Sequence, residues 1–197
     1  MTPHHSDGHP HRFDPANKHV LDSAERRQAL PPEATLSSIP VGPHDTVVDL
    51  GAGTGYFSIP AAAMTNETVH AVDVSTEMLD ELKQRQDAAG VKNIELVQGT
   101  IENVPLDDQL ADVVIASLVL HEVEPLEQGI QEIHRLLKQG GKLLCIDWEA
   151  VDSPMGPPLH IRIASDKMSA ALESQGFSIT ARHVPAPALY TLVAEKL

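Results

Sequence analysis

Short apolar stretches of strand length alternate with longer stretches of helical length through the middle of the chain. The strands expected from this pattern lie at residues 46–50, 68–73, 94–98, 112–117 and 142–147. Repeated strand–helix units place the strands in a parallel sheet whose two faces are both covered by helices. The pattern therefore predicts an α/β fold.

Helix ends and helix faces can be assigned within this scheme. The helix after the second strand begins with Ser75 or Thr76 as its N-cap and ends at Gly90. Pro60 removes a backbone hydrogen bond from the preceding helix, which should start late or bend. The helix that leads to Gly140-Gly141 has apolar residues at three- and four-residue intervals, which should face the sheet. They are Leu126, Ile130, Ile133 and Leu137.

Both ends of the alternating region have their own patterns. Residues 20–36 predict one or two short amphipathic helices, interrupted by Pro31-Pro32. After the fifth strand, Ser165 is expected to cap a short helix that runs to Gly176. Two strands at 177–184 and 189–194 then form a hairpin.

The first strand runs into a turn with glycine at every second position, Asp49-Leu50-Gly51-Ala52-Gly53-Thr54-Gly55. Glycines let a ligand approach the backbone closely, so this turn indicates a nucleotide-like ligand. The next strand ends at Asp73, where a carboxylate can accept hydrogen bonds from both hydroxyls of a ribose. The dinucleotide fingerprint would place its third glycine where Tyr56 stands, so a pyrophosphate-binding turn is disfavoured.

Together these motifs resemble the class I S-adenosylmethionine-dependent methyltransferases, specifically the small-molecule branch with the ubiquinone/menaquinone-type C-methyltransferases. The motifs that carry the resemblance are Asp49-x-Gly51-x-Gly53-x-Gly55, Asp73, Gln98-Gly99-Thr100 and Leu137-Lys138-Gln139-Gly140-Gly141-Lys142-Leu143. The resemblance implies a Rossmann-like, doubly wound, mostly parallel seven-stranded sheet with the last strand antiparallel.

The resemblance also implies how the chain is divided. Residues 1–18 are expected to be a flexible, histidine-rich segment and a candidate lid, and residues 19–197 are expected to form a single methyltransferase domain. Within this domain we expect N-terminal helices at 19–44 and a cofactor-binding core at 45–150. An acceptor loop, a helix and the C-terminal hairpin follow at 151–197.

S-adenosyl-L-methionine is the cofactor that the resemblance implies. Asp49 is expected to contact the methionyl ammonium, and its alternative role is to accept N–H bonds within the turn. Asp73 is expected to bind the ribose, and its alternative role is a helix cap. Thr100 stands where relatives carry an acidic residue for the adenine amino group, and a hydroxyl is a weaker acceptor. The expected cofactor-binding residues are Asp49, Gly51, Ala52, Gly53, Thr54, Gly55, Tyr56, Asp73, Val74, Met78, Gly99, Thr100, Ile101 and Ser117.

The expected reaction is in-line displacement of a methyl group onto an oxygen, nitrogen or carbon nucleophile of a small organic acceptor. His121 follows the fourth strand, where ligands meet open α/β sheets, and is the candidate catalytic base. Its alternative role is a hydrogen bond that holds the loop. The candidate acceptor-binding residues are Arg12, Phe13, Trp148, His160 and Arg162, and packing or a solvated loop is the alternative for the last three.

Charge and composition narrow the partners. A formal net charge of −14 repels phosphate backbones and anionic lipid surfaces, so neither nucleic acid nor a membrane is an expected partner. Cys145 is the single cysteine, which indicates a reducing compartment, and without a signal-like or membrane-spanning segment we expect the cytoplasm. No metal site is expected, and a homodimer is compatible with the sequence.

Two other functions stay open on the sequence alone. A nicotinamide-dependent oxidoreductase, using NAD or NADP, shares the glycine turn and the ribose-binding acid. A non-catalytic ligand- or metal-binding module would use the N-terminal histidines, with the sheet as a scaffold.

Overall fold

The computed structural model describes residues 23–197. The expectations for the histidine-rich segment at 1–18, and for Arg12 and Phe13 as acceptor-binding residues, lie outside the described residues. Helices α1 (Ala24–Ala29) and α2 (Pro32–Leu36) lie ahead of the sheet and are separated at Pro31, as the two prolines predict.

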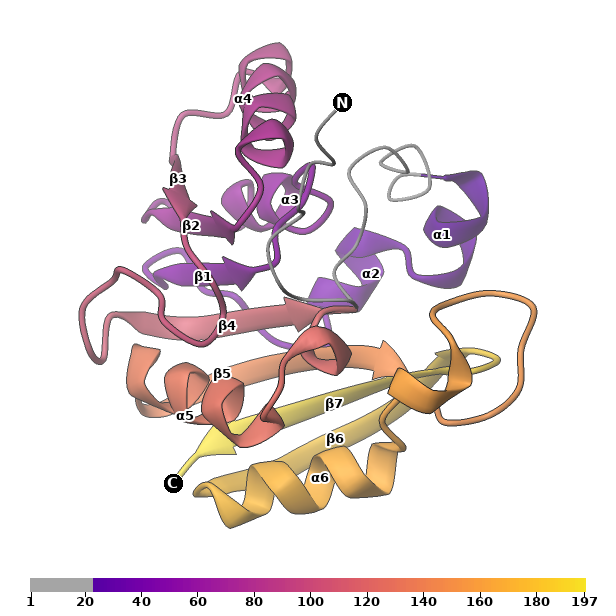
Figure 1. The fold of residues 1–197 in the computed structure, drawn as a ribbon. Coiled ribbons are helices and arrows are strands. Elements are labelled where there is room, and N and C mark those ends of the chain that lie inside the picture. Colours follow the sequence, from indigo (N-terminus) through magenta and orange to yellow (C-terminus); the bar gives the residue numbers. More distant parts are fainter. Residues whose placement is uncertain (1–22) are drawn as a thin grey trace, which may run out of the picture.

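Seven strands of the described region form one sheet (Figure 1). Their bounds are β1 (Val47–Leu50), β2 (Val69–Asp73), β3 (Ile94–Gln98), β4 (Ala111–Ser117), β5 (Leu137–Trp148), β6 (Phe177–Ala186) and β7 (Leu189–Lys196). The strand order is β3-β2-β1-β4-β5-β7-β6, and β7 runs antiparallel to both of its neighbours while the pairings from β3 to β5 are parallel. The predicted seven-stranded Rossmann-like sheet is confirmed.

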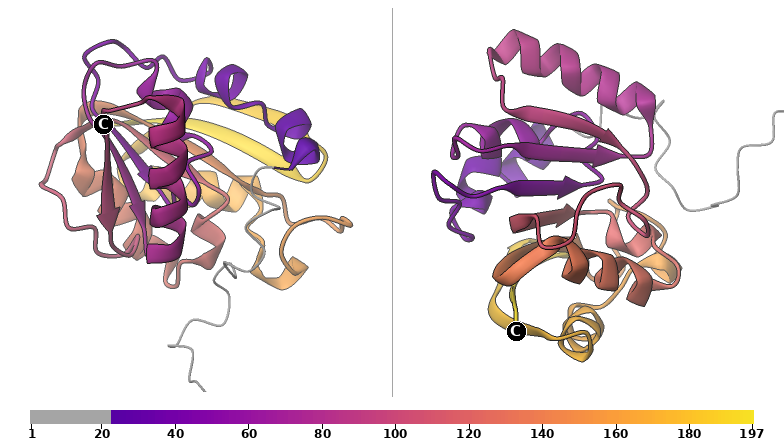
Figure 2. Two further views of the ribbon diagram at one scale, coloured as in Figure 1. Left: turned by 90° about the horizontal axis from the view of Figure 1, so that it is seen from above. Right: turned by 90° about the vertical axis from the view of Figure 1, so that its left-hand side faces the viewer.

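Helices cover both faces of this sheet (Figure 2). Helices α3 (Ser58–Ala62) and α4 (Thr76–Ala89) pack with α2 on the face to which Val47 and Ile115 point. On the other face, α5 (Leu126–Leu136) and α6 (Ser165–Ser174) pack against Val48 and Val114. Neighbouring strand residues thus enter different cores, because side chains alternate along a strand.

The predicted start and end signals of α4 are confirmed, and so is the late start of the helix that contains Pro60. Ser75 is the N-cap of α4, its hydroxyl accepting the N–H of Met78 at 3.3 Å, and Gly90 ends the helix with a φ of 70°. Pro60 lies inside a helix of only five residues, which begins at Ser58.

Two expectations about helix ends are wrong. Ser165 is the first residue of α6 rather than its cap, and Ala164 holds the cap position without a side-chain bond. The Glu149 carboxylate accepts the N–H of Ser165 at 3.1 Å instead, a tertiary contact that no local pattern contains. Leu137 is extended and begins β5, so it faces the core from the sheet rather than from α5.

Within residues 23–197, no helix combines the length and the apolar character needed to cross a bilayer. In the same region, no group of three or more histidine, cysteine or acidic side chains is arranged to hold a metal ion.

Candidate active site

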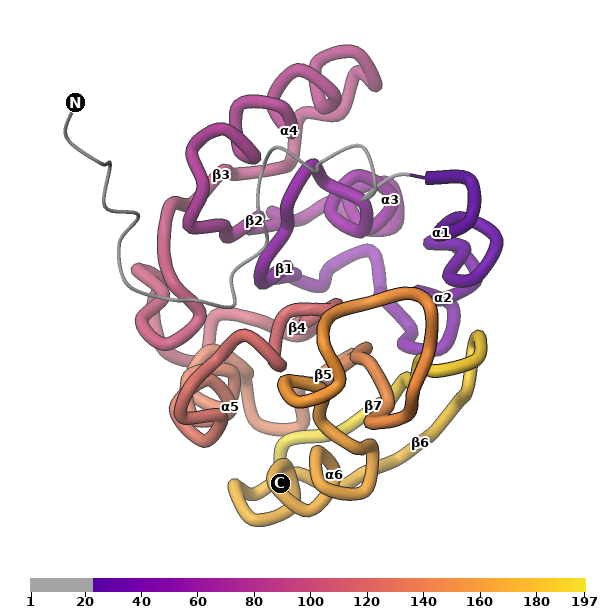
Figure 3. The backbone as a smooth tube through the Cα atoms, turned by 45° about the vertical axis from the view of Figure 1, so that its right-hand side comes forward, coloured from indigo at the N-terminus to yellow at the C-terminus, as the bar shows by residue number. Residues whose placement is uncertain are grey.

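A cavity of about 670 Å³ lies at the carboxyl ends of the central strands. Most of the predicted site residues line it, in agreement with the position of ligands in open α/β sheets. They are Gly51, Ala52, Gly53, Thr54, Tyr56, Asp73, Val74, Met78, Gly99, Thr100, Ile101, Ser117, His121 and Trp148. Helix α1 and the loop between β5 and α6 approach this end of the sheet from the same side (Figure 3).

The glycine turn brings the main chain to the cavity wall. Gly51 and Gly53 have φ values of 66° and 54°, in the region that favours glycine. A Cβ atom on Gly51 would lie 2.6 Å from Cγ2 of Val119, so only glycine lets the turn pass this close to the loop after β4. Gly55 also has a positive φ, but it packs against Leu82 of α4 and does not line the cavity.

Asp73 is held at the cavity by the backbone of two segments. Its Oδ2 accepts the N–H of Gly53 at 2.8 Å, and its Oδ1 accepts the N–H of Ser75 at 2.9 Å. Each carboxylate oxygen has a further lone pair, so the group can still accept bonds from a ligand. Asp73 therefore joins β2, the glycine turn and α4 into one unit.

Asp49 lies beneath the turn and does not line the cavity. Its side chain is buried in β1, and its Oδ2 accepts the hydroxyl of Ser58 at 2.5 Å. Burial, with a smaller contribution from the charge of Asp73, raises the pKa of Asp49 to about 7 despite that hydrogen bond. Contact of Asp49 with a cofactor ammonium stays a prediction.

His121 and Asp147 form a buried pair at the ends of two neighbouring strands. Nδ1 of His121 lies 2.6 Å from Oδ1 of Asp147, whose Oδ2 accepts the backbone N–H of His121 at 3.1 Å. Burial lowers the pKa of His121, but the hydrogen bond to Asp147 and the charges of Asp147 and Glu122 outweigh it, so the pKa lies above its ordinary value. The imidazole is thus oriented by a carboxylate that is itself fully buried.

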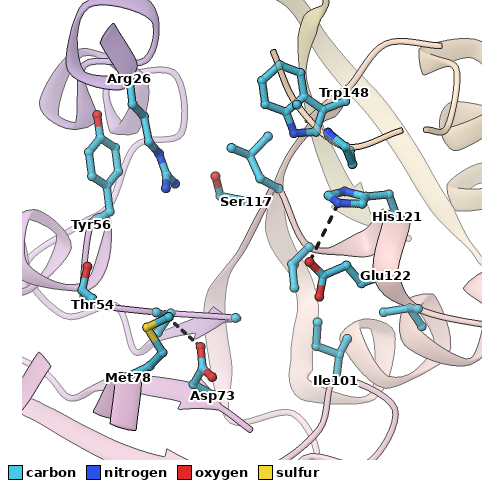
Figure 4. Close-up of a pocket in the computed structure, with 18 of the residues that line it drawn as sticks. Arg26, Thr54, Tyr56, Asp73, Met78, Ile101, Ser117, His121, Glu122 and Trp148 are labelled. Atoms are coloured by element: carbon cyan, nitrogen blue, oxygen red, sulfur yellow. Dashed lines mark hydrogen bonds and ion pairs between the residues drawn. The ribbon is translucent and has the colours of Figure 1, made fainter. Parts of the chain in front are cut away.

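Glu122 stands beside His121 and faces the same cavity (Figure 4). Its Oε1 lies 3.9 Å from Nε2 of His121. The two residues belong to a short 3-10 helix, η2 (Leu120–Glu122), that follows β4. Three ionisable groups, Asp147, His121 and Glu122, therefore form a row from the core to the cavity.

Trp148 forms a wall of the cavity together with the loop that follows β5. The backbone of Gly156 lies on the indole, where a Cβ atom would come within 2.7 Å of Cδ2. Arg162 is buried and donates to the carbonyl oxygens of Val151, Met155 and Pro157, and its guanidinium carbon lies 5.5 Å from the indole centre. Arg162 therefore shapes the loop.

Neither Arg162 nor His160 is among the residues that line the cavity, and His160 is exposed. Acceptor binding by these two side chains stays a prediction.

Three residues have contacts that the sequence did not predict: Arg26 and Glu122 on the cavity wall, and Asp147 buried behind it. Arg26 of α1 lines the cavity and stacks on Tyr56, 4.3 Å from the ring centre to the guanidinium carbon. No sequence signal joins these two residues, which are 30 positions apart in the sequence. Asp147 and Glu122 could have been paired with His121, because both β4 and β5 end at this edge of the sheet.

These features define an α/β protein with a nucleoside-type site. Residues 48–145 match the family described as "Methyltransferase domain". A 138-residue stretch is 30% identical to the demethylmenaquinone methyltransferase of Bacillus mycoides and covers 69% of this chain and 57% of that protein. A 130-residue stretch is 37% identical to an uncharacterized methyltransferase of Mycobacterium tuberculosis and covers 66% of this chain and 50% of that protein.

The fold of a solved structure, a SAM-dependent methyltransferase from Aquifex aeolicus, matches with a TM-score of 0.87 at 25% identity. The match covers 94% of this chain and 100% of that one. This chain belongs to the class I S-adenosylmethionine-dependent methyltransferases. It spans about half the length of the curated relatives that it matches.

The residues at the cavity fit the cofactor of this family. The hydroxyls of Thr54 and Ser117 are buried at the cavity and have no hydrogen-bond partner within the described part of the chain. Buried hydroxyls without partners are costly, so a polar ligand at this place would stabilise them. The Asp73 carboxylate and the glycine turn line the same cavity, which fits an adenosyl sulfonium. Binding of the ribose by Asp73 stays a prediction.

Proposed function

We propose that this protein is an enzyme that transfers the methyl group of S-adenosyl-L-methionine to a small organic acceptor by in-line displacement. The observation that carries the proposal is the bond from Gly53 N–H to Asp73 Oδ2, 2.8 Å long. This bond joins the glycine turn to Asp73, the carboxylate that we propose as the ribose ligand. A cavity of about 670 Å³ is in the range of small-molecule sites, and the charge of −14 disfavours nucleic acid as the acceptor.

The protein's main contribution is to position the reactants. When bound, S-adenosyl-L-methionine supplies a methyl carbon that its sulfonium already activates. Holding two reactants at attack distance can account for ~7–11 kcal/mol of a barrier. Leu30, Val119 and Ile161, which line the cavity from three different segments, would exclude water.

His121 is the proposed catalytic base. Asp147 is an acceptor when ionised, so the proton of the imidazole lies on Nδ1 and the lone pair on Nε2. Nε2 is the nitrogen on the side of Glu122 and the cavity (Figure 4). In this arrangement His121 takes the proton that the acceptor loses, and Asp147 positions the ring.

Calorimetric titration with S-adenosylhomocysteine tests the cofactor part of the proposal. The wild-type protein should bind this product, and Asp73→Ala should weaken binding by about 10- to 100-fold, because bonds from ribose hydroxyls to a charged acceptor are lost. Asp80→Ala, an exposed carboxylate on α4 outside the cavity, is the matched control. Binding of a reduced nicotinamide dinucleotide in place of S-adenosylhomocysteine would overturn the proposal.

A further inference from the structure

The positions of His121 and Glu122 indicate which kind of nucleophile the site can bind. Because Asp147 engages Nδ1 of His121, only Nε2 is available to a ligand. Glu122 Oε1 lies 3.9 Å from this nitrogen, and both residues line the cavity. A nucleophile placed here therefore meets two acceptors at once: the lone pair of Nε2 and a carboxylate oxygen.

The number of hydrogens on the nucleophile decides how well it satisfies both acceptors. A primary ammonium has three N–H donors, so it can donate to both acceptors, and the loss of one proton to Nε2 frees its lone pair for attack on carbon. A hydroxyl has one donor and leaves one of the two acceptors without a partner. A carbon nucleophile makes no strong hydrogen bond with either. An amine thus matches this wall better than the other two nucleophiles.

The charge of the cavity wall also favours an amine as the acceptor. The acidic side chains on the cavity wall come from four different segments: Glu25, Asp73, Glu102 and Glu122. Apart from His121, Arg26 is the one basic side chain among the described residues that line it. A cationic ammonium is attracted to such a wall, and an anionic acceptor is repelled.

A second observation at the same wall points to a polar ligand. The hydroxyl of Ser117, at the end of β4, is more than nine-tenths buried and has no hydrogen-bond partner within residues 23–197. Ser117 lines the cavity between the glycine turn and His121 (Figure 4). The cofactor fit described above uses this hydroxyl, and an N–H group of an acceptor beside the cofactor can donate to the same oxygen.

Other residues of the cavity wall are apolar. They include Trp148, Pro157, Ile161 and Leu189. This surface suits a ring or an alkyl group on the ligand, because burial of apolar area is favourable. We propose that the acceptor is a small amine with an apolar, ring-sized substituent, and that Glu122 and His121 together hold its nitrogen. This inference rests on the methyltransferase function proposed above.

The proposed reaction balances without a further reactant. The ammonium form of the acceptor gives one proton to Nε2 of His121, which frees its nitrogen lone pair. That lone pair forms the N–C bond, while the C–S bond of the donor breaks and leaves its electron pair on sulfur. The products are an N-methylated ammonium, a thioether and a protonated His121, which returns its proton to solvent.

Binding to the complex with S-adenosylhomocysteine tests the acceptor class by calorimetry. Three probes share one ring and differ in the polar group: phenethylamine, 2-phenylethanol and phenylacetate. We expect the amine to bind at least about tenfold more tightly than the alcohol, since a bond to a charged partner is gained, and the carboxylate to bind least. An amine that binds no better than the alcohol, or not at all, overturns the inference.

Variants of Glu122 identify the group responsible. Glu122→Gln should remove the preference for the amine, and Glu122→Asp, which keeps the charge, should retain part of it. Glu127→Gln, an exposed residue of α5 outside the cavity, is the control. Undiminished amine preference in Glu122→Gln also overturns the inference. Failure of the wild-type protein to bind S-adenosylhomocysteine would instead refute the function on which the inference rests.

Discussion

The two halves of the cavity are built from different kinds of groups. In the half that we propose for the cofactor, at the ends of β1 and β2, the turn from Gly51 to Thr54 brings main-chain atoms to the wall beside the carboxylate of Asp73. In the half that we propose for the acceptor, at the ends of β4 and β5, the side chains of His121, Glu122 and Trp148 line the wall. The position of main-chain atoms depends on the fold itself, whereas side chains can be substituted without a change of fold. The halves should therefore respond differently to substitution.

The largest effect that separates the halves is expected from His121→Gln. Loss of a general base lowers kcat by about 10²- to 10⁴-fold. The affinity for S-adenosylhomocysteine should stay unchanged, because His121 belongs to the acceptor half. Steady-state kinetics with a methyl acceptor measure kcat, and calorimetry measures the affinity for S-adenosylhomocysteine. An equal loss in both would show that the cavity is not divided in this way.

A smaller effect, confined to the cofactor half, is expected from Gly51→Ala. The added Cβ would lie 2.6 Å from Cγ2 of Val119, so the turn or the loop after β4 must move. We expect affinity for S-adenosylhomocysteine to fall by about 10- to 100-fold, the result of 1–3 kcal/mol of overpacking.

Gly140→Ala is the control for this substitution. The φ of Gly140 is 73° and nothing lies within 4 Å of its Cβ position. Alanine at this position therefore causes backbone strain but no steric clash. Equal affinities of the two variants would mean that the close approach of the turn to Val119 has no part in binding.

A smaller effect in the acceptor half is expected from Gly156→Ala. The new Cβ would press on the indole of Trp148 at 2.7 Å and displace the loop between β5 and α6. One methyl group in a binding pocket is worth about tenfold in specificity, so KM for the acceptor should rise by that order. Calorimetry should give the same affinity for S-adenosylhomocysteine as the wild type. A loss of cofactor affinity alone would contradict the assignment of this loop.

The smallest expected effect is a shift of the pH profile in Asp147→Asn. Burial lowers the pKa of His121, but the larger combined effect of Asp147 and Glu122 raises it, so the pKa lies above 6.5. The base form of His121 grows as pH rises through this raised pKa, and kcat should rise with it. In Asp147→Asn the midpoint of the profile should move to lower pH. Arg162, whose charge lowers the same pKa, remains in the variant.

The same raised pKa affects folding stability. In the wild type, the stabilising contribution of His121 is present below about pH 6.5, its unfolded pKa, and is lost as pH rises through the folded value. Thermal unfolding across this window should show a smaller decline in Asp147→Asn. If the pH profile of kcat has the same midpoint in the wild type and in Asp147→Asn, Asp147 does not set the pKa of His121.

The sequence predicted the backbone-built half more completely than the side-chain-built half. Gly51 and Asp73 could be found because a strand, a glycine turn and an acid at the next strand end have fixed spacing. The contact between His121 and Asp147 joins residues 26 positions apart in the sequence and depends on the register of β4 and β5. Arg162 was predicted from its chemistry alone, yet its donors bind loop carbonyls, a choice that only the folded loop determines.

Trp148 is the sole tryptophan of the sequence, and it lines the cavity, where Gly156 packs on its indole and the guanidinium carbon of Arg162 lies 5.5 Å from the ring centre. Its emission therefore comes from one place in the molecule. A compound that enters the acceptor half will alter the intensity or the wavelength of that light without any label. The intrinsic fluorescence of Trp148 can therefore be used to screen a library of metabolites for binding.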